Sequence, residues 1–203
     1  GSLGARTINQ CLMNNLEKVK SSGIQFIWQT GKIYIDEARA AVAKAGELPM
    51  LHVTDFISDM ATAYRAADLV ISRAGAGSIS EFCLLQKPVI LVPSPNVAED
   101  HQTKNALALV EKNAALYVKD IDAQEQLLGK AIEAVNQPDL LKNLSHNITQ
   151  LAFTDSANVV LKEARIAVSV AVSGSGVKIV YTVFISVSDH FVNLVLINEL
   201  VFS

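Results

Sequence analysis

The sequence predicts an α/β protein with a Rossmann-like, doubly wound parallel sheet. Short apolar runs alternate with segments of helical periodicity through most of the chain, and parallel strands need long crossovers of this kind. The runs are continuously apolar, which is typical of strands buried on both faces. A turn of small residues, 73–77, joins one run to a helix, and its glycines allow a ligand to come close to the backbone.

Three helices and three strands are expected ahead of that turn. The first helix ends near Gly23, the second is rich in alanine and ends at Gly46, and the third leads into the central apolar run. The expected helices are 7–19, 34–45 and 58–66, and the expected strands are 24–30, 49–53 and 68–72.

The same alternation continues after the turn. A helix is expected to begin at Ser78 and to end near Gln86, ahead of Pro88, and Asp122 and Glu125 have the spacing of a helix cap and its partner. The remaining expected strands are 88–92 and 115–118, and the remaining expected helices are 101–112, 122–135, 138–152 and 156–164.

The composition excludes several classes of protein. Half of the 203 residues are apolar and the net charge is −3. The sequence has no cluster of lysine and arginine dense enough to indicate a nucleic-acid partner. Cys11 and Cys83 lie far apart, without a CxxC motif, and are expected to be small core residues in a reducing compartment. The histidines are scattered, so we expect no metal site, and no cofactor is predicted.

The small-residue turn lies where a parallel strand ends and a helix begins. Such a place offers backbone N–H groups and a positive dipole to an anion, although small residues there often serve only to pack a helix on a strand. Ser78 and Glu81 have the spacing of a capping box, but a carboxylate at this point can also bind two ribose hydroxyls. Spacing alone leaves both interpretations open.

Ligands of such folds bind at the carboxyl ends of the strands. The loops at 2, 56, 74–78 and 96–102 are all expected at that edge. The first of them leads into a helix without a strand ahead of it, so we expect the chain to be a fragment whose upstream part is missing. No signal peptide is expected, because residues 1–8 carry no apolar segment.

We expect a ligand-binding domain at 1–165 and a separate tail at 166–203. The tail has three charged residues among long apolar runs, and it is too interrupted for a confident membrane-spanning helix. Extra strands, or an extension from cloning or from a misread sequence, fit it better.

Three blocks of the sequence resemble the MurG family of peptidoglycan N-acetylglucosaminyltransferases. The blocks are 1–9 (GSLGARTIN), 52–81 (HVTDFISDMATAYRAADLVISRAGAGSISE) and 87–109 (KPVILVPSPNVAEDHQTKNALAL). They are similar to the carboxyl-terminal, donor-binding half of these inverting family 28 enzymes, which have the two-domain GT-B fold and convert lipid I to lipid II. The first glycine of the family's GGS-x-GA loop is absent here.

The resemblance implies a role in binding UDP-N-acetylglucosamine (UDP-GlcNAc) for ten residues. Those implied to touch the nucleotide are Ser2 and the N–H groups of Ala76, Gly77 and Ser78 at the diphosphate, Glu81 at the ribose, Ile57 at the uracil edge and Phe56 beside the base. Those implied to lie near the sugar are Gln102, Asn105 and His101.

Ordinary structural roles remain open for several of these residues. Phe56 and Ile57 can be core residues, and His101 a helix-start residue. The Gln102 amide can both donate to and accept from sugar hydroxyls, but its ordinary role would be that of a solvated helix residue. Arg73 can reach a phosphate or form a structural ion pair, and 99–100 are expected to be surface carboxylates.

The resemblance implies that the two halves of a longer enzyme have different roles. This half would hold the donor, while the general base and the pocket for lipid I would belong to the amino-terminal half. The fragment alone would be inactive, and the whole enzyme would act at the inner face of the bacterial cytoplasmic membrane as a peripheral protein. The alternatives are another GT-B glycosyltransferase or an epimerase, and a non-catalytic nucleotide-sugar-binding domain.

Overall fold

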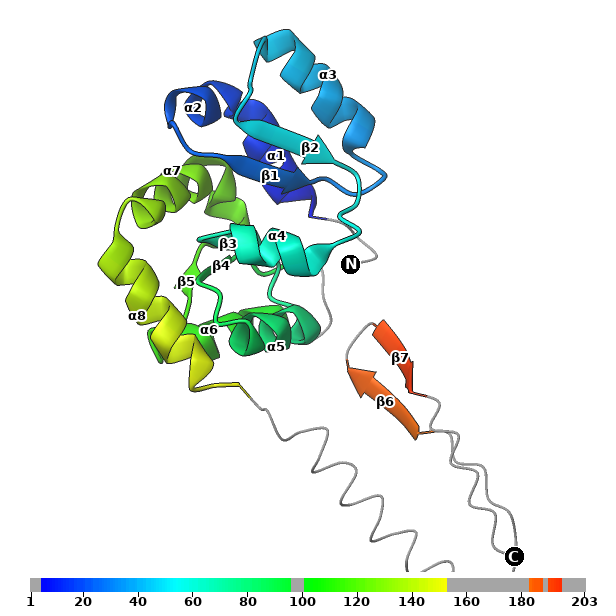
Figure 1. Cartoon of the computed structure of the whole chain (residues 1–203), viewed down its shortest axis with the longest axis vertical. Coiled ribbons are helices and arrows are strands. Elements are labelled where there is room, and N and C mark those ends of the chain that lie inside the picture. Colours follow the sequence, from blue (N-terminus) through cyan, green and yellow to red (C-terminus); the bar gives the residue numbers. More distant parts are fainter. Residues whose placement is uncertain (1–4, 96–100, 153–182, 188–189, 195–203) are drawn as a thin grey trace, which may run out of the picture. The chain divides into compact units, whose positions relative to one another are not determined.

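The computed structural model describes residues 5–95, 101–152, 183–187 and 190–194. The chain divides into two compact units, Gly1–Ala152 and Phe153–Ser203. In the first unit, helices and parallel strands alternate as the sequence predicts (Figure 1). Its strands are β1 (Phe26–Gln29), β2 (Leu51–Thr54), β3 (Val70–Ser72), β4 (Val89–Leu91) and β5 (Leu116–Tyr117).

Helices connect these strands and pack around them (Figure 1). Those of the first part are α1 (Arg6–Asn14), α2 (Leu16–Ser21), α3 (Ile35–Ala45) and α4 (Met60–Ala66). Those of the second part are α5 (Ala76–Leu84), α6 (His101–Val110), the 3-10 helix η2 (Asp120–Asp122), α7 (Ala123–Val135) and α8 (Pro138–Thr149).

All strand pairs of the first unit are parallel, but they form two sheets. One sheet has the order β1-β2, with Phe26 opposite Leu51, and the other has the order β3-β4-β5, with Val70 opposite Val89. The described residues contain no strand that pairs with both β1 and β3. The continuous sheet expected from the sequence is therefore present as two parallel portions.

A common hydrophobic core joins the two portions. Trp28 of β1, Ile90 of β4 and Leu127 of α7 belong to one buried cluster. A second cluster packs α5, α6 and α8 against the other side of β4, with Phe82, Leu109 and Ile148 among its members. The apolar runs of the sequence thus supply the interior, as predicted.

The polar side chain of Asn9 is buried beside Trp28, with only 1% of the residue exposed. Its Oδ1 accepts a hydrogen bond of 2.8 Å from Trp28 Nε1, and its Nδ2 donates one of 2.9 Å to the carbonyl of Thr30. Both ends of the amide are satisfied, which is what a buried polar group requires. Asn9 therefore ties α1 to β1.

The two cysteines are unpaired and buried, as expected for core residues. Burial raises the pKa of the Cys11 thiol, and it also raises the pKa of the Cys83 thiol. A buried thiol with a raised pKa is a poor nucleophile, so these side chains serve packing.

Several predicted helix boundaries were wrong. The single helix expected at 7–19 is interrupted at Asn15, whose Nδ2 donates to the Cys11 carbonyl at 2.8 Å and competes with helix continuation. Asp122 is the N-cap of α7 but makes no side-chain capping bond, so the predicted pair with Glu125 does not form. Gly46 ends α3 with φ of 87°, as predicted. The helix expected at 156–164 lies outside the described residues.

The second unit contains β6 (Val183–Val187) and β7 (His190–Leu194). These strands pair antiparallel, with Val183 opposite Leu194. Across the described ranges of the chain, no helix is both long and apolar enough to cross a bilayer.

Candidate functional site

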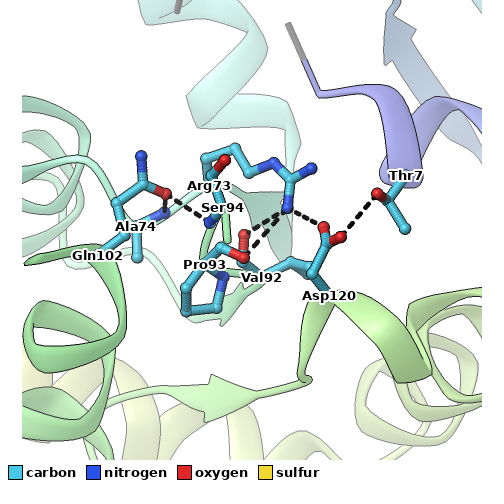
Figure 2. A network of polar contacts seen from close by, with 8 residues as sticks. All are labelled: Thr7, Arg73, Ala74, Val92, Pro93, Ser94, Gln102 and Asp120. Atoms are coloured by element: carbon cyan, nitrogen blue, oxygen red, sulfur yellow. Dashed lines mark hydrogen bonds and ion pairs between the residues drawn. The ribbon is translucent and has the colours of Figure 1, made fainter. Parts of the chain in front are cut away.

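Residues that follow the three strands of the second sheet meet in one polar network (Figure 2). Arg73 follows β3, and its Nη1 donates to the carbonyls of Val92 (3.1 Å) and Pro93 (3.3 Å) beyond β4. The same nitrogen forms an ion pair with Asp120, beyond β5. Asp120 also accepts a hydrogen bond of 2.9 Å from the Thr7 hydroxyl near the start of α1.

We refer to Thr7, Arg73 and Asp120 as the clasp. Since Thr7 precedes β1 and the other two members follow β3 and β5, the clasp ties the first part of the unit to the carboxyl edge of the second sheet. Of the two roles considered for Arg73, the structural ion pair is confirmed. The side chains of Arg73 and Asp120 are 17% and 18% exposed, so this pair is only weakly screened by water.

The amino end of α5 lies directly after the clasp arginine. Gly75 is its N-cap and makes no side-chain capping bond, and the first turn contains no acidic residue. The first helical bond runs from Ile79 N–H to the Gly75 carbonyl, so the N–H groups of Ala76, Gly77 and Ser78 have no intrahelical acceptor. This end of α5 is therefore electropositive, and among the described residues no side chain caps its first N–H groups.

The space beside this helix end is open. A Cβ placed on Gly75 or on Gly77 would meet no heavy atom within 4 Å. The two glycines of the turn are thus not explained by close packing of helix on strand, and an anion has room to approach.

The capping box, one of the two interpretations of Ser78 and Glu81, does not form. Because Gly75 caps the helix, Ser78 lies inside its first turn, two residues after the helix begins. The Glu81 carboxylate instead accepts a hydrogen bond of 3.1 Å from the Tyr64 hydroxyl of α4. The capping interpretation of Glu81 was wrong.

Tyr64 is held between Glu81 and the core. Its ring packs edge-on against Phe82 with centroids 5.9 Å apart. Burial, and then the charge and hydrogen bond of Glu81, raise the pKa of Tyr64 from 10.0 to about 12. The hydroxyl donates to the Glu81 carboxylate and orients it.

This shift predicts an alkaline titration that can be assigned to one residue. Ultraviolet absorbance should show a tyrosine ionising near pH 12, and Tyr64→Phe should remove that step. Because the folded pKa is the higher one, the contribution of Tyr64 to stability should persist below pH 10 and decline as pH rises from 10 to 12. Glu81→Gln should move the step to lower pH, and an unchanged step would contradict the contact.

Two side chains of α6 reach back to the turn after β3. Gln102 Oε1 accepts hydrogen bonds from the backbone N–H groups of Ala74 (3.3 Å) and Ser94 (2.9 Å). Asn105 Nδ2 donates to the Ala74 carbonyl at 3.3 Å. Both residues thus lie against the turn rather than in solvent.

The residues expected near a base lie beyond β2. Phe56 is 66% exposed, so the interpretation of Phe56 as a core residue was wrong. The Thr54 hydroxyl donates to the Phe56 carbonyl at 3.0 Å. The N–H of Ile57 donates to Gln29 Oε1 at 2.9 Å. These bonds fix the backbone of the loop and leave the aromatic ring exposed to solvent.

The remaining candidate residues are only partly described. His101 is the first residue of α6 and is exposed. Ser2 and the carboxylates at 99–100 lie outside the described residues.

The sequence reasoning missed four residues that support the site. Thr7 and Tyr64 carry no local signal of their role. Gln29 and Asp120 come at or just after the ends of strands, and the rule that strand ends converge would have identified both.

A sequence profile of the Glycosyltransferase family 28 C-terminal domain matches residues 1–160. The chain belongs to this family of glycosyltransferase domains, as its three sequence blocks indicated.

Curated relatives carry the name UDP-N-acetylglucosamine--N-acetylmuramyl-(pentapeptide) pyrophosphoryl-undecaprenol N-acetylglucosamine transferase. The protein of that name from Phocaeicola vulgatus is 80% identical over 163 residues, which are 80% of this chain and 43% of that protein. The one from Bacteroides fragilis is 65% identical over 164 residues, again 80% of this chain and 43% of that protein. The chain therefore spans less than half the length of these relatives.

Solved structures confirm the predicted Rossmann-like, GT-B architecture. The crystal structure of Acinetobacter baumannii MurG superposes with a TM-score of 0.69 at 28% identity, over 82% of this chain and 48% of that one. The glycosyltransferase VinC in complex with DTDP superposes with a TM-score of 0.57 at 16% identity, over 76% of this chain and 38% of that one. The second likeness shows the fold alone.

Proposed function

We propose that this chain is the UDP-GlcNAc-binding half of a transferase that adds N-acetylglucosamine to lipid I in peptidoglycan synthesis. The observation that carries the proposal is the uncapped amino end of α5, with open space beside it and a carboxylate one to two turns along the same helix. A nucleoside diphosphate has the two matching features, an anionic diphosphate and a ribose with paired hydroxyls. The names of the relatives supply the particular sugar and acceptor.

In this proposal each group of the donor (diphosphate, ribose, base and sugar) has residues that bind it. The N–H groups of 76–78 bind the diphosphate, with Ser2 as a further donor, and Glu81 accepts hydrogen bonds from the ribose hydroxyls. Phe56 flanks the uracil, and the Ile57 backbone meets its edge with the carbonyl, because the Ile57 N–H already donates to Gln29 Oε1. The sugar lies toward the start of α6, near His101, Gln102 and Asn105.

The reaction inverts the anomeric centre. The C4 hydroxyl of the acceptor attacks the anomeric carbon, and UDP leaves with an added negative charge on its diphosphate. Oriented N–H groups and a helix dipole stabilise that charge without reorganisation. The clasp and the α6 amides hold these groups in place.

The general base and the lipid I pocket belong to the portion of the relatives that this chain does not span. We therefore propose that the chain binds donor without transferring sugar by itself. The complete enzyme would work as a peripheral protein at the inner face of the cytoplasmic membrane, where lipid I is presented.

Calorimetric titration with UDP-GlcNAc tests the proposal. The wild-type chain should bind, and Glu81→Ala should bind about 10-fold more weakly, because two ribose hydroxyls lose their acceptor at a cost of roughly 1–3 kcal/mol. UDP-glucose and UDP-galactose, titrated in parallel, report the preference for the donor sugar.

Glu125→Ala is the matched control, since Glu125 is an exposed carboxylate on α7. It should leave the affinity unchanged. A wild-type chain that shows no heat of binding with UDP-GlcNAc or with UDP would refute the proposal.

A further inference from the structure

We infer that Gln102 and Asn105 are positioning residues that fix the turn before α5, and that Gln102 offers a ligand only hydrogen-bond donors. The inference rests on the proposed function, because it concerns how the anion-binding end of α5 is held.

Two side chains of α6 hold the turn through the backbone of a single residue, Ala74. Ala74 is completely buried, its N–H donates to Gln102 Oε1, and its carbonyl accepts from Asn105 Nδ2. Gln102 and Asn105 are separated by three positions on α6 and so lie on one face of that helix. The peptide groups on both sides of Ala74 are therefore set by α6, immediately before the Gly75 cap.

The clasp holds the same turn from its other side. Arg73, the residue before Ala74, is bonded to Asp120 and to the carbonyls beyond β4. With 73 and 74 both anchored, the direction of the first N–H groups of α5 is fixed before any ligand arrives. Such preorganisation reduces the cost of ordering the site on binding.

The orientation of the Gln102 amide follows from its partners. Ala74 and Ser94 both present N–H donors, so the group that faces them must be the carbonyl oxygen, not the NH₂ group. Figure 2 shows this oxygen between the two backbone nitrogens, with the amide nitrogen pointing away from them. Among the described residues, no acceptor engages that nitrogen.

The acceptor of Gln102 is thus already used by the protein. This corrects the expectation that its amide both donates to and accepts from sugar hydroxyls. A ligand atom at Nε2 must be an acceptor, such as a phosphate oxygen or a hydroxyl lone pair. Replacing that atom with a group that only donates should abolish the contact.

Titration with UDP, which lacks the sugar, separates positioning from sugar binding. Gln102→Met keeps the side-chain length but removes the acceptor, and it should weaken UDP binding about 10-fold. Asn105→Leu should act in the same direction. Lys104→Ala, on the exposed face of α6, should leave UDP affinity unchanged. If Gln102→Met weakens UDP-GlcNAc binding but leaves UDP binding intact, Gln102 is only a sugar ligand and the inference is overturned.

Amide hydrogen exchange on the ¹⁵N-labelled chain provides a readout that needs no ligand. In Gln102→Met, exchange at Ala74 and Ser94 should be about 10-fold faster than in the wild type. Gln102→Glu restores an acceptor and should restore slow exchange at both amides. Because its added carboxylate would itself repel a diphosphate, this variant is measured by exchange alone. Unchanged exchange in Gln102→Met would overturn the inference.

The two hypotheses fail in different ways. A wild-type chain that binds no UDP refutes the proposed function. A wild-type chain that binds UDP, beside a Gln102→Met chain that binds it equally well, refutes the positioning role alone.

Discussion

Gly75→Asp should bind UDP more than about 100-fold more weakly than the wild type and yet be more stable. An aspartate at the N-cap accepts hydrogen bonds from the first N–H groups of α5. Its negative charge also interacts favourably with the positive end of the helix dipole. A Cβ at Gly75 meets no atom within 4 Å, and the backbone there has φ of −68°, so the side chain fits. The free energy of unfolding should rise by about 0.3–1 kcal/mol, from the cap and the helix dipole together.

Loss of binding has a separate cause. The carboxylate occupies the donors that a diphosphate would use and repels its charge, at a cost of about 3 kcal/mol or more. Calorimetry with UDP and thermal unfolding measure the two effects on the same sample. Gly75→Ser is the control, because it caps the helix without a charge and should weaken binding much less. If Gly75→Asp binds UDP as well as the wild type, the α5 end is not the anion site.

Asp120→Ala should lower the free energy of unfolding by about 2–3 kcal/mol. The change removes the partner of Arg73 and leaves a guanidinium that is 17% exposed without a counter-charge. Uncompensated charge of this kind is more costly than the mere loss of a surface ion pair. Thr7 loses its acceptor as well. Urea unfolding at neutral pH measures the difference.

Two further variants distinguish the clasp from a general effect of charge. Asp122→Ala, at the other end of η2, should cost less than about 0.5 kcal/mol, since Asp122 makes no side-chain cap. In an Arg73→Met background, Asp120→Ala should cost less than about 1 kcal/mol, because no buried charge is left without a partner. Equal losses for Asp120→Ala in both backgrounds would contradict the clasp.

The sequence predicted the order and type of the elements in the first unit because apolar runs and helical periodicity directly reflect burial. It placed boundaries less well where a local polar group decides them. Asn15 divides the first helix through a bond to a carbonyl, and Gly75 starts α5 ahead of Ser78. Such competition between side chain and backbone depends on geometry that periodicity does not contain.

The candidate site was predicted as a set of loops, and the structure adds the contacts between them. Glu81, Gln102 and Asn105 were identified from the family resemblance, whereas their partners in this structure are Tyr64 and the backbone of Ala74. A hydrogen bond between residues 17 or 28 positions apart leaves no trace in local sequence. Asp120 was missed, although the general rule for strand ends would have identified it.

Because Trp28 is buried, its intrinsic fluorescence reports on the folding of the first unit. Trp28 is the single tryptophan of the chain; the residue is 4% exposed, and its indole N–H donates to Asn9. Its emission should therefore be blue-shifted in the native state and move to longer wavelength when β1 separates from α1. Because α5, whose amino end is proposed to bind the diphosphate, follows β3 of the other sheet, fluorescence and calorimetry would follow different parts of the first unit.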